Sequence, residues 1–157
     1  MRVLAIDSSL RSTGWAVMDD EELVTYGTIK TDNSIDVIDR INYIAKELKT
    51  IFRQKECEYV AIELLVVFRL NSANTIQALT GLYYHLLCEF RKLKYLVAEI
   101  PPSQWKSRCG IEGKKREEQK ESSKAKVKEL YDIEVSDDEA DAICIGICAS
   151  MLEKEEE

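Results

Sequence analysis

Four carboxylate residues from three distant segments are the part of this sequence best suited to chemistry. Asp7 and Glu63 each end a short apolar run, and Asp138 with Asp141 opens an apolar helix. An acid at the end of a strand usually faces a cleft, because a buried charge is costly without a partner. Carboxylate oxygens suit divalent cations, and such cations can stabilise the attacking and leaving oxygens of a phosphodiester. We therefore predict a metal site for phosphate chemistry.

Each of these acids, taken alone, could instead be a turn or helix-cap residue. That explanation is weaker for the set, because Ser136 already supplies a cap through the S-x-x-E pattern of a capping box. Asp7 is the best candidate for a ligand shared by two ions, since it would end a central strand. We expect two Mg²⁺ ions per site, and Mn²⁺ should substitute because it prefers similar oxygen ligands. Asp137 would face another side of the helix.

The apolar pattern indicates alternating strands and helices along the chain. Strands are predicted at 2–7, 15–18, 23–31, 59–63 and 95–100, and helices at 36–52, 71–92, 103–109, 116–131 and 136–152. This order predicts an α/β fold with a five-stranded mixed sheet flanked by helices on both faces. Asp7 and Glu63 would then lie on neighbouring central strands with the last helix across them. We expect one domain over 1–152 and a solvated acidic tail over 153–157.

Composition narrows the class of protein. The chain has 157 residues, a formal net charge of -7, 45% hydrophobic and 32% charged residues, and no apolar run long enough to span a membrane. We therefore expect no membrane partner and a cytoplasmic location. The five cysteines show no CxxC pattern, so reduced thiols are expected. Nine basic residues lie between Lys106 and Lys128, which makes this stretch a candidate DNA-binding surface despite the negative total.

Four motifs in a fixed order carry a family resemblance. They are A-I-D-S-S at 5–9, T-G-W-A at 13–16, A-I-E at 61–63 and D-E-A-D-A at 138–142. Together they resemble the RuvC family of Holliday junction resolvases, within the ribonuclease H-like superfamily, over nearly the whole chain. The segments W-K-S at 105–107 and G-I-E-G-K at 110–114 are similar to the compact members found in phages and Gram-positive bacteria.

The resemblance implies a homodimeric, magnesium-dependent endonuclease that cuts two opposed strands of a four-way DNA junction. Asp7, Glu63, Asp138 and Asp141 would be its metal-binding, catalytic acids. Family members also place a basic residue near the scissile phosphate, and Lys106 matches one such position. A second basic residue would be Lys114, Lys115 or Arg116. The residues expected to contact DNA are Phe68, Arg69, Lys106, Arg108, Lys114, Lys115, Arg116 and Lys120.

One departure from the family pattern concerns the aromatic residue that stacks at the junction centre in bacterial enzymes. In the bacterial enzymes this aromatic residue comes shortly after the glutamate. In this chain the first aromatic residue after Glu63 is Phe68. A phage-type nuclease that trims several branched DNAs is therefore an alternative. An actin-like or sugar-kinase-like nucleotide-binding domain is an alternative from another class, but those proteins duplicate the fold and this chain has room for one copy.

A twofold homodimer is expected, because two coordinated nicks require two active sites. The predicted helix over 71–92 has apolar residues around much of its surface, which is more than packing on one sheet face requires. We expect one stripe of this helix, including Tyr84 and Leu87, to face the partner subunit.

Overall fold

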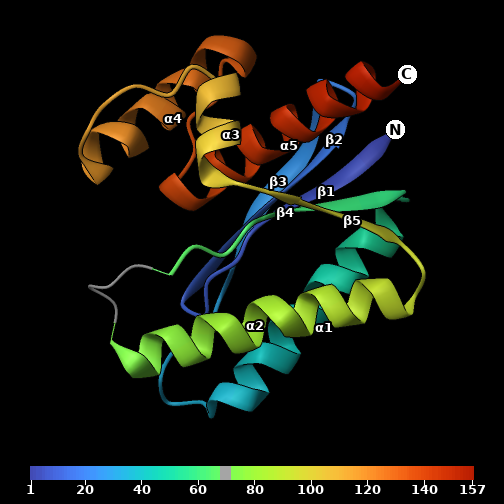
Figure 1. Ribbon diagram of the computed structural model, residues 1–157, viewed down its shortest axis with the longest axis vertical. Helices are drawn as coiled ribbons and strands as arrows, with labels where there is room; N and C mark the ends of the chain where they lie inside the picture. Colours follow the sequence, from blue (N-terminus) through green and yellow to red (C-terminus); the bar gives the residue numbers. More distant parts are fainter. Residues whose placement is uncertain (68–71) are drawn as a thin grey trace.

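A five-stranded sheet forms the centre of the computed structural model, which describes residues 1–67 and 72–157. Its strand order is β3-β2-β1-β4-β5 (Figure 1). The strands β1, β2 and β3 form an antiparallel meander, and β4 and β5 extend the sheet in parallel from β1. The strands are β1 (Arg2–Asp7), β2 (Ser12–Asp19), β3 (Glu22–Lys30), β4 (Tyr59–Glu63) and β5 (Leu96–Ile100). The predicted mixed sheet is confirmed.

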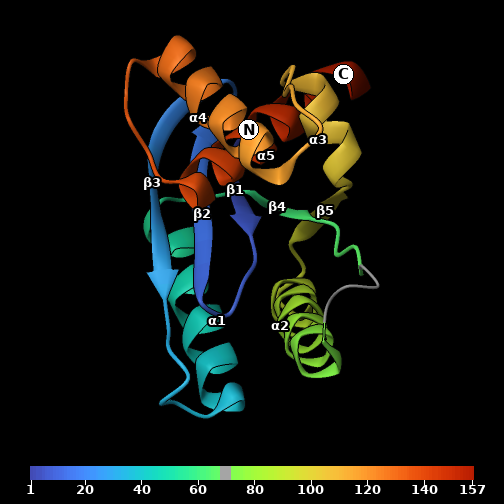
Figure 2. The same cartoon turned by 90° about the vertical axis from the view of Figure 1, so that its left-hand side faces the viewer.

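Helices cover both faces of the sheet, as predicted. The helices are α1 (Val37–Gln54), α2 (Ala73–Lys92), α3 (Pro102–Arg108), α4 (Arg116–Tyr131) and α5 (Asp137–Glu156). Figures 1 and 2 show α1 and α2 on one face and α3, α4 and α5 on the other. The side chains of β1 explain this arrangement, because successive side chains of a strand point to opposite faces of the sheet and those of β1 are apolar on both faces. Leu4 and Ile6 pack with α1 and α2, whereas Val3 and Ala5 pack with α5.

The helix α5 lies directly on the sheet and is buried around most of its surface. Its residues from Ala142 to Ser150 are all buried. Close approach depends on Gly146, because a Cβ there would lie 2.6 Å from Cγ of Met18 and 3.2 Å from Cβ of Ala5. This packing holds the middle of α5 against β1 and β2.

The structure differs from two expectations about the helices. The last helix was expected to end at 152, whereas α5 continues to Glu156 and Glu155 forms an ion pair with Arg108; residues 154–157 are exposed to solvent. Leu87 does not face outward, because it is only 4% exposed and belongs to the core between α2 and the sheet. Tyr84 is 58% exposed and remains on the outer face of α2.

Three observations complete the description. All five cysteines are free thiols, as expected, and Cys144 and Cys148 are buried packing residues. No helix among the described residues is long and apolar enough to cross a membrane. Phe68, Arg69 and Asn71, which the sequence assigned to DNA contact and to the start of a helix, lie outside the described residues.

Candidate metal centre

Asp7 and Glu63 end two neighbouring parallel strands. Ile6 on β1 pairs with Ile62 on β4, so the next residue of each strand is an acid at the same edge of the sheet. Both side chains are partly buried. The sheet register thus brings together two of the predicted site residues from segments far apart in the sequence.

The start of α5 brings Asp138 beside this pair of strands. Ser136 caps the helix as predicted: its hydroxyl accepts from the Glu139 amide at 3.3 Å, and the Glu139 carboxylate accepts from the Ser136 amide at 2.9 Å. Gly14 lies opposite Asp7 in the β1–β2 register. A Cβ on Gly14 would lie 2.1 Å from the backbone oxygen of Asp138, so the first turn of α5 rests on a strand position that only glycine permits.

The pKa values of the acids show that their charges interact. Burial raises the pKa of Asp7 well above its usual value, and the charges of Glu63, Asp141 and Asp138 raise it further. Burial also raises the pKa of Asp141 to about 6, with Glu63 and Asp138 adding to the shift. Four carboxylates in one partly buried place repel one another, and a divalent cation would relieve that repulsion.

Glu63 has a hydrogen-bond donor that the sequence did not reveal. The indole Nε1 of Trp105 donates to Oε2 of Glu63 at 2.5 Å, and Trp105 is only 1% exposed. Burial raises the pKa of Glu63, while this hydrogen bond and the charge of Lys106 lower it. The donor therefore favours the ionised carboxylate, which is the form that binds a cation.

Lys106 lies close to the acids, as the family resemblance implied. Its charge lowers the pKa of both Glu63 and Asp141. The Lys106 Nζ donates to Oε1 of Gln119 at 3.0 Å and lies 5.5 Å from the centre of the Trp105 ring. Two neighbouring side chains thus hold the Lys106 ammonium beside the carboxylates.

The helix α4 supplies further side chains to the site. The hydroxyl of Ser123, which is buried, lowers the pKa of Asp141 by hydrogen bonding. The charge of Arg116 lowers the pKa of Asp7. Of the three residues proposed for a second basic role, Arg116 is therefore the one whose charge acts on a site acid.

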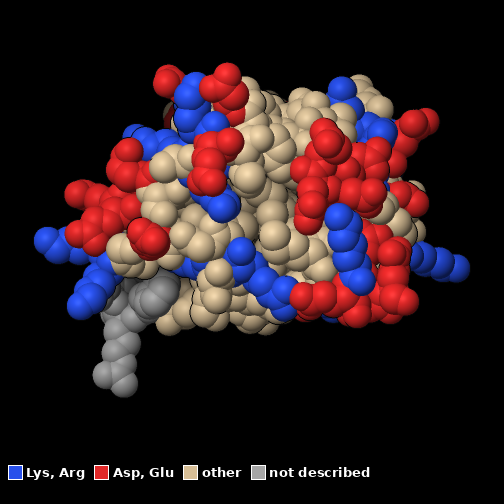
Figure 3. All heavy atoms as spheres, turned by 90° about the horizontal axis from the view of Figure 1, so that it is seen from above, with Lys and Arg blue, Asp and Glu red and all other residues tan. Residues whose placement is uncertain are grey.

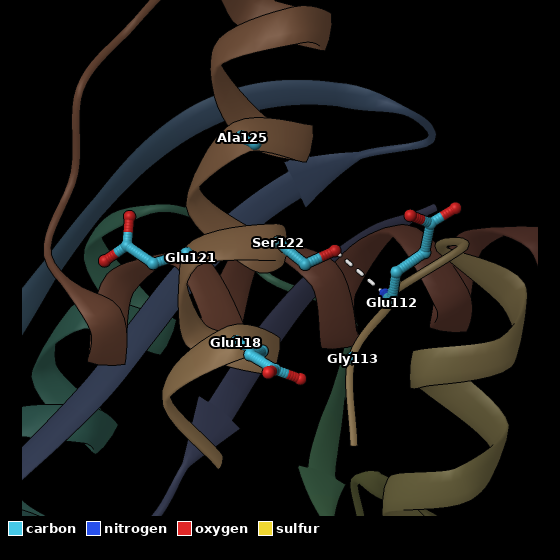
Figure 4. Close-up of a pocket in the computed structure, with 6 residues that line it drawn as sticks. All are labelled: Glu112, Gly113, Glu118, Glu121, Ser122 and Ala125. Carbon is cyan, nitrogen blue, oxygen red and sulfur yellow. Dashed lines mark hydrogen bonds between the residues drawn. The ribbon is translucent and has the colours of Figure 1, made fainter. Parts of the chain in front are cut away.

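The loop between α3 and α4 is tied to α4 by hydrogen bonds. The Glu112 amide donates to the Ser122 hydroxyl at 2.9 Å (Figure 4). Gln119 Nε2 also donates to the Gly113 carbonyl at 3.0 Å. Figure 4 also shows the open hollow beside this loop, which is lined by Glu112, Gly113, Glu118, Glu121, Ser122 and Ala125. Its lining residues include three glutamates and no basic residue, so it does not suit a phosphate group.

Two other predicted DNA-binding residues form ion pairs with acids outside the set of four. Arg108 pairs with Glu155, with Nη2 and Oε2 at 2.9 Å, and Lys120 pairs with Asp137 at 3.4 Å. Asp137 thus forms surface ion pairs, with Lys120 and also with Lys124. Figure 3 shows acidic and basic side chains mixed on the side of α4 and acidic side chains gathered toward the C-terminal end of α5, with uncharged surface between them.

The donor set fits a divalent metal ion. All four acids offer hard oxygen ligands of the kind that Mg²⁺ and Mn²⁺ bind. Within residues 1–67 and 72–157, no three His, Cys, Asp or Glu side chains are close enough to hold an ion as they stand. Binding of an ion would therefore require the carboxylate oxygens to move closer together.

Several supporting residues were missed at the sequence level: Gly14, Trp105, Gln119 and Ser123. Gly14 and Trp105 belong to motifs that carried the family resemblance, but their contacts depend on the packing of α5 and α3. Gln119 and Ser123 lie on a charged helix whose pattern gives no sign that one face points at the acids.

Sequence comparisons identify relatives over nearly the whole chain. The family model for crossover junction endodeoxyribonuclease RuvC matches residues 3–149. The RuvC protein of Parasynechococcus marenigrum (strain WH8102) is 31% identical over 154 residues, which cover 94% of this chain and 96% of that protein. The RuvC protein of Synechococcus sp. (strain CC9902) is 29% identical over 153 residues, with the same coverage of 94% and 96%.

Solved structures share the fold. Thermus thermophilus RuvC in complex with a Holliday junction substrate matches with a TM-score of 0.80 and 18% identity, over 98% of this chain and 96% of that chain. The yeast mitochondrial Holliday junction resolvase Ydc2 matches with a TM-score of 0.65 and 13% identity, over 99% and 80% of the two chains. At these identities the likeness establishes the ribonuclease H-like fold.

Proposed function

Because this chain belongs to the RuvC family of crossover junction endodeoxyribonucleases, we propose that Asp7, Glu63, Asp138 and Asp141 hold the metal ions with which it hydrolyses junction DNA. The protein is a Holliday junction resolvase and a metal-dependent nuclease. The observation that supports the site is the raised pKa of both Asp7 and Asp141, since burial and neighbouring carboxylates disfavour the charge of each. Such a cluster is a costly arrangement unless a cation neutralises it.

The residues around the acids have separate roles in the proposed reaction. Two Mg²⁺ ions, when bound, would supply an activated water and neutralise charge on the scissile phosphate. Lys106, held by Gln119, donates to the phosphate or to the leaving oxygen as negative charge develops there. Arg116 is our choice for the second basic residue, because its charge already acts on Asp7. Mn²⁺ should replace Mg²⁺.

We also propose that the enzyme works as a twofold homodimer on a four-way junction. A symmetric junction offers two equivalent strands for cleavage, and a single chain offers one set of acids. The outer face of α2 supports this proposal through Tyr84, an aromatic side chain that is 58% exposed. Leu87 has no part in this surface, since it is buried within its own subunit. A DNA substrate also favours the cytoplasm as the site of action.

The decisive experiment is substitution of Asp7 by Asn. Asp7→Asn should abolish cleavage of a synthetic four-way junction in Mg²⁺ while junction binding survives, because it removes a metal ligand and leaves the basic surface unchanged. Asp137→Asn is the matched control, since Asp137 lies on the same helix turn as Asp138 but pairs with Lys120 and Lys124. Cleavage at the wild-type rate by Asp7→Asn would refute the proposed site.

The same assay can define the substrate. Three-way, flap and linear duplex DNA should be cut much more slowly than the four-way junction if the enzyme is selective for Holliday junctions. Comparable cleavage of all branched forms would favour the broader, phage-type nuclease.

A further inference from the structure

Trp105 connects the interior of the protein to the metal centre. Its ring is packed in the core with Ile100, Cys109 and the buried face of α5, and only 1% of the residue is exposed. Its one polar atom, Nε1, donates to Oε2 of Glu63 at 2.5 Å. Among the hydrogen bonds of the described residues, this is the one that reaches the Glu63 carboxylate. A core tryptophan whose N–H points at a metal-binding acid does more than fill space.

The chemistry of indole suits it to a specific task. The Trp N–H is a donor only, so it cannot bind a cation or accept a proton. When it holds Oε2 of Glu63, that oxygen has a fixed position and Oε1 remains for the metal ion. Partners that orient metal ligands in this way tune metal affinity, and their loss typically weakens binding by about 10- to 100-fold.

We propose that Trp105 is a positioning residue that orients Glu63 to bind the metal ion through its Oε1 oxygen. This inference rests on the proposed metal site. It extends to the next residue, because the Lys106 Nζ lies 5.5 Å from the centre of the Trp105 ring. One turn of α3 thus sets the position of an acid that binds the metal and of a cation that binds the phosphate.

The test compares Trp105→Phe with Trp15→Phe. Phenylalanine keeps an aromatic ring but removes the N–H donor. Trp15 is the chain's other tryptophan, and its ring lies against Gly27 of β3, with no hydrogen bond to a site acid in the described part of the chain. Mn²⁺ binding to the DNA-free protein is measured from the electron paramagnetic resonance signal of the free ion. Trp105→Phe should weaken binding about 10-fold or more, and Trp15→Phe should bind like the wild type.

A second measurement uses the unaltered indole and does not depend on the stability of Trp105→Phe. The ¹⁵N–H resonance of the Trp105 side chain, assigned by its persistence in Trp15→Phe, should shift on addition of Mg²⁺ as Glu63 binds the ion. The midpoint of that shift should agree with displacement of Mn²⁺ by Mg²⁺. A resonance that does not respond to saturating Mg²⁺ would overturn the inference.

The outcomes separate this inference from the proposed site itself. Asp7→Asn should remove Mn²⁺ binding if the four acids form the metal centre. If Asp7→Asn loses binding while Trp105→Phe and Trp15→Phe bind equally well, the metal site stands and the role of Trp105 is refuted. If Asp7→Asn binds Mn²⁺ like the wild type, the metal site itself is refuted.

Discussion

Replacement of Gly14 by Ala should greatly lower the cleavage rate of the enzyme, although it changes no acidic or basic residue. Gly14 lies opposite Asp7 in the sheet, and the first turn of α5 crosses directly over it. An added Cβ would lie 2.1 Å from the backbone oxygen and 2.6 Å from the backbone carbon of Asp138. Backbone atoms cannot rotate away as a side chain can, so the start of α5 must shift away from β2.

The size of the shift follows from the contact distances. Ordinary van der Waals contact begins near 3.4 Å, so relief of a 2.1 Å contact requires a displacement of 3.4 − 2.1 = 1.3 Å. A misplacement of about 1 Å in a catalytic site can cost roughly 100-fold in rate. Overpacking of this kind also lowers the free energy of unfolding by about 1–3 kcal/mol. We therefore expect a folded protein whose cleavage rate falls by roughly 100-fold.

The assay is single-turnover cleavage of a four-way junction at saturating protein and Mg²⁺, together with urea unfolding. Gly146→Ala is the matched control, because it overpacks the same helix against the same sheet but meets the flexible Met18 side chain, at 2.6 Å from Cγ. It should lower the free energy of unfolding while cleavage per folded molecule stays near the wild-type rate. Wild-type cleavage by Gly14→Ala would refute the argument that α5 positions the acids through this contact.

Three further predictions concern individual groups. Lys106→Ala should lower the single-turnover rate by about 10²- to 10³-fold with the fold intact. If the variant only lost affinity for the junction and cleaved bound DNA normally, Lys106 would be a DNA-positioning residue instead. Asp141 has its pKa raised from 3.8 to about 6, so the folded, metal-free protein binds a proton that the unfolded chain does not. Its unfolding free energy should therefore fall as pH rises between those values, while Mn²⁺ binding strengthens; a wild-type pH slope in Asp141→Asn would contradict this. Tyr84→Glu should shift the proposed dimer toward monomer in sedimentation equilibrium, whereas Tyr43→Glu, at an exposed site on α1, should not.

The sequence predicted the positions of the acids well because each ends or begins a regular element. The apolar runs before Asp7 and Glu63 are short and contain β-branched residues, which favours buried strands, and the S-x-x-E pattern at Ser136 marks a helix start by its own hydrogen bonds. The structure has these elements within a few residues of their predicted bounds. Local sequence patterns were sufficient to predict these strand ends and this helix start, because backbone hydrogen bonding and burial enforce them.

Contacts between elements could not be predicted in the same way. The apolar residues of α2 suggested an outward stripe that included Leu87, but only the packing against the sheet decides that Leu87 is inside and Tyr84 outside. The link from Trp105 to Glu63 joins residues 42 positions apart and depends on where α3 sits after β5. The acidic residues after 152 looked like a tail by composition, yet the pairing of Glu155 with Arg108 accompanies continuation of α5.

The central place of α5 has a consequence for biosynthesis. This helix contacts all five strands and also carries Asp138 and Asp141 of the proposed metal centre. During translation, the meander, β4 and β5 emerge first, with an exposed sheet face and only half of the acids. The cutting site can therefore assemble only when the last helix has emerged and docked. A nascent chain that lacks α5 would hold only Asp7 and Glu63 of the four acids and could not form the proposed metal centre.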